Sequence, residues 1–256
     1  GALAASQGGR AGLKVFPMRR AAILSCLVAL HACAHAACQS GLAERLHNKL
    51  EPQRALIHVL AVCHPWQGHL GRSVVVLPTL GASPGTLDLE ILVVQHPDNA
   101  TSERPAIVAR QRQSVANVGS DSMAVSDIEF DAARYRLSSQ TQSFGLRIHR
   151  RSTIADQPAS SETLSLYALD RGNDLHLRLD EFETRRERGR WGPGCAGHFE
   201  KQERQVAVVH SAADGKAMAD LQVRQTDSSS VNELQGDECV ESSELPRFRE
   251  STLRYD

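Results

Sequence analysis

Four runs between Ile128 and Phe182 alternate apolar and polar residues, and this alternation constrains the fold more than any other feature of the sequence. The apolar positions are Ile128, Phe130, Tyr135 and Leu137 in the first run, Phe144, Leu146 and Ile148 in the second, Leu164, Leu166 and Ala168 in the third, and Leu175, Leu177 and Leu179 in the fourth. Successive side chains of a strand point to opposite faces, so such runs are typical of strands with one face on a core. The turn-forming run Asp170–Asp174 joins the last two as a hairpin. We therefore expect one antiparallel sheet here.

Short apolar runs separated by turn-forming residues flank this central sheet. A helix is expected over Gly41–Leu50, since Leu42, Leu46 and Leu50 share one helical face. The other expected strands are Arg54–Val62, Ser73–Leu77, Thr86–Val94, Ile107–Ala109, Gln205–Val209, Ala219–Val223 and Thr252–Asp256. The polar stretch that ends at Asp127 and the run Asp227–Asn232 are expected as connections. About ten short strands predict an all-β chain, folded as an antiparallel β-sandwich or as few-bladed propeller-like sheets, with a short N-terminal helix.

The start of the chain has the pattern of a secretory signal peptide. Met18–Arg20 supplies the positive charge, Ala21–Leu30 the short apolar run, and Ala34–Ala36 a cleavage site of small residues. The apolar run is shorter than the roughly 20 residues that a membrane span needs. We expect residues 1–36 to be upstream residues and a signal peptide, and residues 37–256 to form a single β-rich domain without a transmembrane span.

Export predicts a periplasmic or secreted location. The alternative is a lipid anchor through Cys33 or Cys38, because the residues before each cysteine loosely match a lipoprotein box. The last expected strand stops with the chain at Asp256, which suggests that a C-terminal piece is missing.

The charge balance argues against binding to nucleic acid. Four of the 29 basic residues and none of the 30 acidic residues precede position 37, so the expected mature chain has a net charge of −5 with histidine neutral. A nucleic-acid binder needs a basic surface.

Four cysteines follow the expected cleavage site, which is an even number for an oxidising compartment. We predict a disulfide between Cys195 and Cys239, because each follows a turn-rich run that could lie at one edge of a sheet. Cys38 and Cys63 form the remaining pair, with a buried free thiol at Cys63 as the alternative.

Several segments of the chain resemble a group of proteins exported by Gram-negative bacteria. The segments are Thr86–Val94, Ala133–Leu137 followed by Phe144–Ile148, Glu162–Tyr167, Cys195–Gly197 with Phe199, Cys239–Ser242 and Thr252–Asp256. They cover most of the mature chain and are structural in character. The group has no established activity, so the resemblance implies export and a β fold but no reaction, and it implies a few residues beyond Asp256.

Candidate metal ligands are Cys63, His64 and His69 in one short segment, with His198 as a further ligand. Their donor atoms suit zinc or copper, although a turn with a packed aromatic residue describes Pro65, Trp66 and Gly68 more simply. Asp170, Asn173 and Asp174 suit a turn better than a calcium loop, and Glu181 and Glu183 are more typical of solvent-facing charge than of a glycosidase pair.

We assign no catalytic residue and expect no cofactor. Neither a nucleophile elbow nor a glycine-rich phosphate loop is expected, and Ala82–Gly85 and Gly192–Cys195 have the composition of turns.

The aromatic residues best able to anchor a binding partner are Trp66, Tyr135, Tyr167 and Trp191. Our leading hypothesis is a non-catalytic binding or interaction module of the cell envelope, whose partner is an envelope protein or a cell-wall component. The alternative is a secreted, metal-dependent hydrolase that uses His64, His69 and His198.

Overall fold

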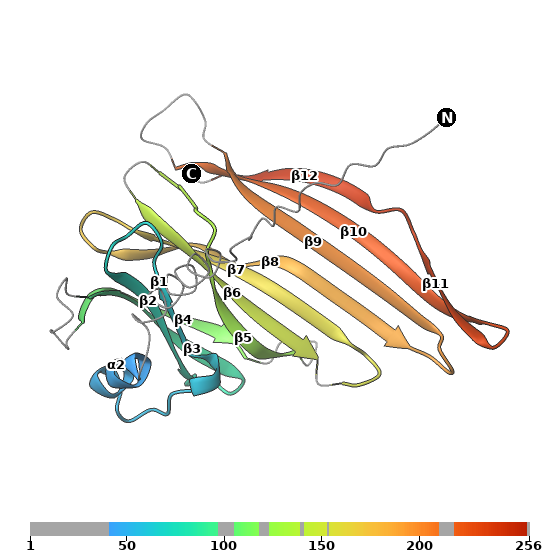
Figure 1. The fold of residues 1–256 in the computed structure, drawn as a ribbon, viewed down its shortest axis with the longest axis horizontal. Helices are drawn as coiled ribbons and strands as arrows, with labels where there is room; N and C mark the ends of the chain where they lie inside the picture. Colours follow the sequence, from blue (N-terminus) through green and yellow to red (C-terminus); the bar gives the residue numbers. More distant parts are fainter. Residues whose placement is uncertain are drawn as a thin grey trace, which may run out of the picture. The chain divides into compact units, whose positions relative to one another are not determined.

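The computed structural model describes residues 41–96, 105–117, 123–138, 141–152, 154–209 and 218–254. The chain divides by its contacts into Gly1–Ala36 and Ala37–Asp256, and every described residue belongs to the second unit. The described strands form two antiparallel sheets (Figure 1). This confirms the all-β prediction and selects the sandwich over the propeller-like alternative. No helix in the described ranges is long and apolar enough to cross a membrane.

The small sheet has four strands in the order β1-β2-β3-β4. Its elements, with the two helical segments that precede it, are α2 (Leu42–Leu50), the 3₁₀ helix η2 (His58–Leu60), β1 (Val62–Pro65), β2 (Arg72–Leu80), β3 (Thr86–Gln95) and β4 (Ala106–Ala116). Each strand pairs with the next one along the chain, so the sheet is a simple meander.

The large sheet has eight strands. They are β5 (Met123–Asp131), β6 (Gln142–Ser152), β7 (Ala159–Leu169), β8 (Leu175–Trp191), β9 (Gly197–Val209), β10 (Asp220–Gln235), β11 (Glu238–Ser243) and β12 (Arg247–Leu253). Strands β5 to β11 are neighbours in chain order, and β12 pairs with β10 beside β11. The four alternating runs of the sequence fall in β5, β6, β7 and β8, which are consecutive in this sheet as predicted.

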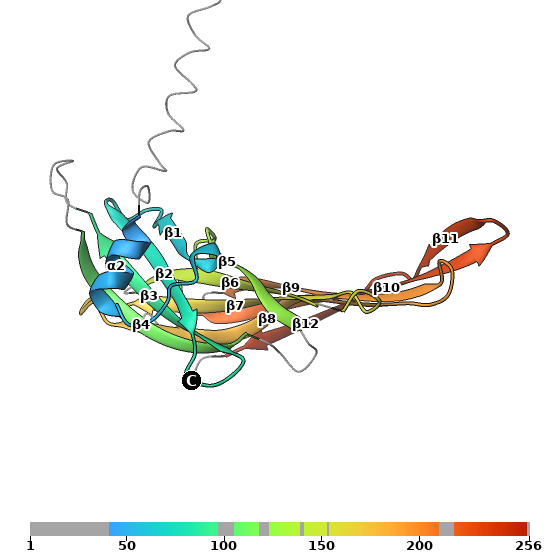
Figure 2. The same ribbon diagram turned by 90° about the horizontal axis from the view of Figure 1, so that it is seen from below.

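The apolar faces of the two sheets meet in one core. Val76 of β2 and Ile91 of β3 pack in one cluster with Leu146 of β6 and Tyr167 of β7, and all four side chains are at most 1 % exposed. Figure 2 shows the small sheet and α2 on one side of the large sheet. The alternating apolar positions of β6, Phe144, Leu146 and Ile148, thus face the core between the two sheets.

Two smaller clusters cover the outer faces of the sandwich. Leu42 and Leu46 of α2 pack on Val75 and Leu92 of the small sheet, which confirms the predicted amphipathic helix. On the outer face of the large sheet, Leu164 and Leu166 of β7 pack with Tyr135, Leu137 and Leu221; the full cluster is Tyr135, Leu137, Leu164, Leu166, Ala168 and Leu221.

Buried polar groups join the sheets as well. The Tyr167 hydroxyl donates to Gln113 Oε1, and Gln113 Nε2 donates to Asp180 Oδ1 over 2.6 Å. Arg150, only 7 % exposed, donates to the Ala116 carbonyl at 3.2 Å. Removing one partner would leave a buried group unpaired, so these bonds fix how the sheets face each other.

Three sequence predictions about elements are wrong. Arg54–Val62 is not a strand: Leu56 makes one bridge to Thr79, and η2 turns the chain so that Leu60 enters the core. The polar stretch before Asp127 belongs largely to β4 and β5, and Asp227–Asn232 lies inside β10. The first alternating run is also shorter than predicted, because Tyr135 and Leu137 are buried outside β5.

The large sheet continues beyond the sandwich into a region that we call the distal strands. They comprise Arg185–Trp191 of β8, Gly197–Glu203 of β9, Thr226–Gln235 of β10, and β11. None of these residues is buried, and none belongs to a core cluster. Figure 1 shows β8, β9 and β10 running past the small sheet toward β11.

Candidate functional site

The structure separates the four aromatic residues predicted to bind a partner. Trp66, Tyr135 and Tyr167 are 5 %, 6 % and 0 % exposed and belong to the core, whereas Trp191 at the end of β8 is 43 % exposed. Trp66 packs edge-on against Phe144 with ring centroids 5.1 Å apart. Trp191 is therefore the member of the set that a ligand can reach.

Trp191 is held in place by the hairpin of β8 and β9. Trp191 lies opposite Gly197, and Phe199 lies opposite Gly189. The two rings pack edge to face with their centroids 4.8 Å apart. A Cβ atom at Gly189 would overlap the Phe199 ring, and one at Gly197 would lie 2.8 Å from Phe199 Cε2. Each aromatic side chain thus covers the glycine of the opposite strand, an arrangement that strengthens glycine-containing sheets.

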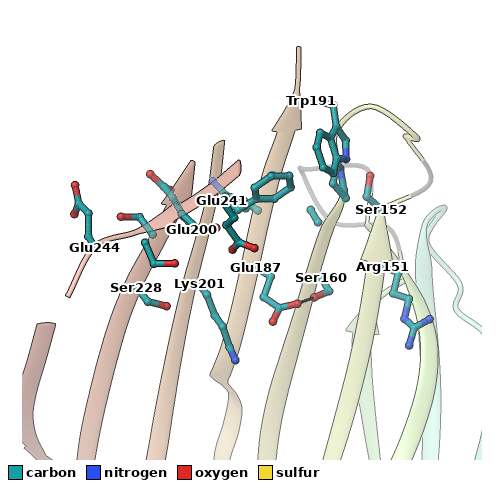
Figure 3. A pocket seen from close by; sticks show the side chains of 18 of the residues that line it. Arg151, Ser152, Ser160, Glu187, Trp191, Glu200, Lys201, Ser228, Glu241 and Glu244 are labelled. Atoms are coloured by element: carbon teal, nitrogen blue, oxygen red, sulfur yellow. Dashed lines mark hydrogen bonds between the residues drawn. The ribbon is translucent and has the colours of Figure 1, made fainter. Parts of the chain in front are cut away.

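A groove of about 970 Å³ runs across the distal strands beside this aromatic pair (Figure 3). Its floor is formed by β8, β9 and β10, one wall by Ile154, Ala155 and Pro158, and the other by Glu241 and Pro246. The Gly189 N–H donates to the Pro158 carbonyl at 2.8 Å, which fixes the first wall to β8. The volume lies at the upper end of the range of about 300–1,000 Å³ for small-molecule sites.

Polar side chains on the groove floor differ in whether they already have partners. Glu187 accepts hydrogen bonds from Ser160 at 3.0 Å, drawn in Figure 3, and from Arg185. Burial alone would raise the pKa of the Glu187 carboxyl, but these hydrogen bonds outweigh it and the pKa is lowered. Lys201 pairs with Glu203 at 2.7 Å. The charges of Glu187 and Lys201 are thus paired with neighbouring side chains of the sheet.

Glu241, Ser228 and Ser230 also line the groove. Their side chains form no hydrogen bond or ion pair with another described residue. They leave hydrogen-bonding capacity along the groove, on strands β10 and β11.

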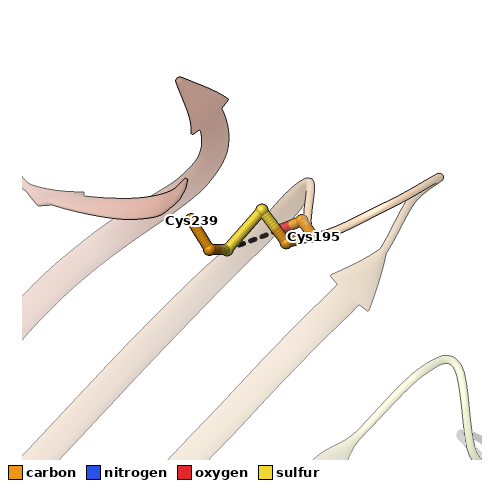
Figure 4. The surroundings of a disulfide bond; sticks show 2 residues. All are labelled: Cys195 and Cys239. Atoms are coloured by element: carbon orange, nitrogen blue, oxygen red, sulfur yellow. Dashed lines mark hydrogen bonds between the residues drawn. A yellow bond between two sulfur atoms is a disulfide. The ribbon is translucent and has the colours of Figure 1, made fainter. Parts of the chain in front are cut away.

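A disulfide holds this end of the sheet together. Cys195, in the turn between β8 and β9, is bonded to Cys239 of β11, with their Cα atoms 6.0 Å apart (Figure 4). The predicted pairing is confirmed. Because Trp191 and Phe199 flank the turn that carries Cys195, the bond ties the aromatic pair to the wall that carries Glu241.

Cys63 is also disulfide-bonded, so the free-thiol alternative is wrong. Cys38 lies outside the described residues, and its pairing with Cys63 stays a prediction. The same holds for Cys33 and for both lipid-anchor alternatives.

The candidate metal ligands do not form one cluster. His64 stacks on Phe130 with ring centroids 4.5 Å apart, and His69 packs on Trp66. Burial and then the charge of Arg72 lower the pKa of His69. His198 belongs to the other sheet, where it lies 3.3 Å from Glu200. Within the described ranges, no group of three or more histidine, cysteine, aspartate or glutamate side chains could hold a metal ion.

Two strings match the letters of short catalytic motifs, but their structural contexts differ from those the motifs require. Gly81–Gly85 has the pattern Gly-x-Ser-x-Gly and forms the turn between β2 and β3. Gly192–Gly197 has the pattern Gly-x-Gly-x-x-Gly and connects β8 to β9. A nucleophile elbow and a phosphate loop each lead from a strand into a helix, so neither string supports that chemistry.

The remaining polar candidates have structural partners. The Asp174 N–H donates to Asp170 Oδ1 at 2.9 Å, and Asn173 has a φ of 66°, as in a hairpin turn. Glu181 binds Arg150, whereas Glu183 pairs with Arg186 at 2.6 Å. The two glutamates thus serve different arginines.

The opposite face of the distal strands is charged and contains a hollow of about 480 Å³. Arg186 pairs with Glu183, and Arg247 lies 3.8 Å from Glu244. Asp227 accepts hydrogen bonds from Gln202 at 2.8 Å and from Gln225 at 2.9 Å. Since no aromatic side chain lines this hollow, the aromatic groove is the stronger candidate for a binding site.

Sequence reasoning found Trp191 but missed Phe199 and the groove. The sequence did contain the pattern that predicts the aromatic pair. In a hairpin centred on Gly194, Trp191 lies opposite Gly197 and Phe199 lies opposite Gly189. Comparison with protein-family models, with curated proteins and with solved structures finds no match to this chain.

Proposed function

We propose that this chain is a non-catalytic binding module of the bacterial cell envelope, and that its ligand lies in the groove beside Trp191. The observation that carries the proposal is the exposed, rigidly supported aromatic pair in a groove of about 970 Å³. Apolar and aromatic walls with a few polar groups are the usual composition of a ligand site. The partner is an envelope protein or a cell-wall component.

The proposed location is the periplasm or the outside of the cell. It is supported by the leader pattern of residues 18–36, by the resemblance to exported proteins, and by a disulfide compatible with an oxidising compartment. Anchoring through Cys33 or Cys38 is the alternative form of the same proposal. The metal-dependent hydrolase gains no support from the positions of His64, His69 and His198 described above.

Intact mass and elemental analysis of the protein from a Gram-negative host test the location. We expect a soluble periplasmic species that begins at Ala37 and contains two disulfides. A lipid-modified Cys33 or Cys38 would show that the protein is anchored to the membrane and is not a soluble periplasmic protein. A stoichiometric zinc or copper ion would contradict the non-catalytic proposal and direct attention to His64 and His69.

Binding of 8-anilinonaphthalene-1-sulfonate, a fluorescent apolar probe, tests the groove. We expect saturable binding at one site in the wild type, and binding at least about tenfold weaker in Trp191→Ala, the effect of losing roughly 1.4 kcal/mol of aromatic contact. Phe248→Ala is the matched control, since Phe248 is 69 % exposed on β12 and does not line the groove. Equal binding by both variants would contradict the proposed site.

A further inference from the structure

We infer that the ligand of the groove is a neutral oligosaccharide. One of its sugar rings stacks on Trp191, and hydroxyl groups along the oligosaccharide point toward Glu241, Ser228 and Ser230. This inference rests on the proposed function and names the chemical class of the ligand.

The aromatic surface of the groove is exposed and held in a fixed position. Trp191 is 43 % exposed although its ring packs against Phe199. The cross-strand glycines and the turn closed by the Gly192 N–H to the Ala196 carbonyl, 2.7 Å, hold it in place. A fixed ring loses little conformational entropy when a flat ligand stacks on it. A pyranose ring has an apolar C–H face of matching size and a rim of hydroxyl groups.

Polar groups lie on the same face of the sheet. Phe199, Ser230 and Ser243 lie opposite one another on β9, β10 and β11. Trp191, Gly197, Asn232 and Glu241 form the next cross-strand row. Directly opposed residues of antiparallel strands share a face, so the serines and Glu241 lie on the same side of the sheet as the aromatic pair.

The hydrogen-bonding capacity of these polar groups limits which ligands they can bind. The Glu241 carboxylate can only accept hydrogen bonds, and the hydroxyls of Ser228 and Ser230 can both donate and accept. Within the described part of the chain none of the three has a partner. An acyl chain offers no donor to them. A saccharide offers several hydroxyl donors together with an apolar ring face.

The charge and the size of the groove narrow the choice of ligand further. Four carboxylates line the groove, those of Glu187, Glu200, Glu241 and Glu244, together with the cationic side chains of Arg151, Arg188 and Lys201. Because the two signs nearly balance, the groove offers no strong net charge that would select an acidic or a basic sugar. The groove volume of about 970 Å³ exceeds what one sugar ring fills. A neutral chain of several sugars, including N-acetylated ones, fits both conditions.

The test is calorimetric titration of the full chain with three soluble neutral oligosaccharides: tetra-N-acetylchitotetraose, cellotetraose and maltotetraose. We expect at least one to bind with a stoichiometry of one. Trp191→Ala should weaken that binding at least about tenfold, and Glu241→Gln about threefold to tenfold, the range expected for losing one aromatic contact or one charge-assisted hydrogen bond. Phe248→Ala should leave it unchanged. Circular dichroism verifies that each variant is folded.

The outcomes separate this inference from the proposed function. Binding of a tetrasaccharide that depends on Trp191 and Glu241 supports both. Binding of 8-anilinonaphthalene-1-sulfonate that depends on Trp191, with no binding of any of the three sugars, overturns the saccharide assignment and leaves the groove as an apolar site. Sugar binding that survives both Trp191→Ala and Glu241→Gln overturns the assignment to this groove. Absence of binding by sugars and apolar probe alike overturns the proposed function too.

Discussion

The sandwich end and the distal strands share β8, β9 and β10, but the burial of their residues differs. In the sandwich end, Leu175 of β8 and Leu221 and Val223 of β10 are at most 5 % exposed. Beyond it, none of the distal residues is buried, and aromatic rings lie beside open space. The comparison teaches that the covered half of the sheet supplies stability, and the uncovered half is free to present a ligand surface.

Truncating a core aromatic in the covered half should have the largest effect on stability. Phe144 stacks on Tyr167 with ring centroids 5.3 Å apart and also packs on Trp66. Phe144→Ala should lower the free energy of unfolding by about 3–5 kcal/mol, measured by urea denaturation. Phe248→Ala, at an exposed position, should change it by less than about 0.5 kcal/mol. Similar losses in both variants would mean that the two halves are not energetically different.

Breaking the disulfide should have the next largest effect, and it should be local. Cys195 and Cys239 are 44 residues apart, for which chain entropy sets an upper estimate of about 4 kcal/mol. In the double variant Cys195→Ser/Cys239→Ser, hydrogen exchange should accelerate in β9, β10 and β11 and change little in β6 and β7. Uniform acceleration along the whole sheet would show that the distal strands share the stability of the sandwich.

Acidification should lower the folding stability by a smaller amount. The groups responsible form a charged network on the outer face of the sandwich. Burial alone would raise the pKa values of Asp131 and Glu162, but hydrogen bonds from Tyr135 to Asp131 and from Thr184 to Glu162, together with Arg147, lower both. The folded state therefore binds protons less readily than the unfolded state.

The stability from this network is present above the unfolded pKa values of about 4 and is lost as the pH falls through the lowered folded values. Wild-type stability should fall below about pH 4.5, whereas Asp131→Asn/Glu162→Gln should be less stable at pH 7 and show a shallower decline. Parallel pH profiles, measured by urea denaturation between pH 3 and 7, would contradict the role of the network.

The smallest effect on stability should come from Trp191→Ala. This variant loses the edge-to-face contact with Phe199, and contacts of that kind contribute about 0.5–1.5 kcal/mol. Urea denaturation should therefore show a loss of about 1 kcal/mol, while ligand binding weakens at least about tenfold. A loss of stability as large as that of Phe144→Ala would mean that Trp191 is a structural core residue and not a ligand-binding residue.

The same contrast explains how far the sequence could predict the structure. Strand β6 and the start of β8 were predicted because burial of one face imposes alternation. Strand β7 is buried on both faces, and it alternates in sequence because Thr163 and Ser165 on one face are polar. The polar part of β4 was missed because its buried face carries the polar residue Gln113, and the segment Asp227–Asn232 was missed because neither of its faces is buried, so neither has an apolar period to detect. The disulfide was predicted from two turn-rich runs. The groove was not, because Phe199 and Glu241 are brought together by register across three hairpin-linked strands.

The most direct test of the binding site uses the two tryptophans of the chain, Trp66 and Trp191. Their indole N–H groups give two signals in a proton–nitrogen correlation spectrum, and the Trp191→Ala variant assigns them. When 8-anilinonaphthalene-1-sulfonate, or a tetrasaccharide found to bind, is added, the Trp191 signal should shift and the signal of buried Trp66 should stay in place. A Trp191 signal that remains fixed while Trp66 shifts, or two signals that both remain fixed, would contradict a ligand site on the distal strands.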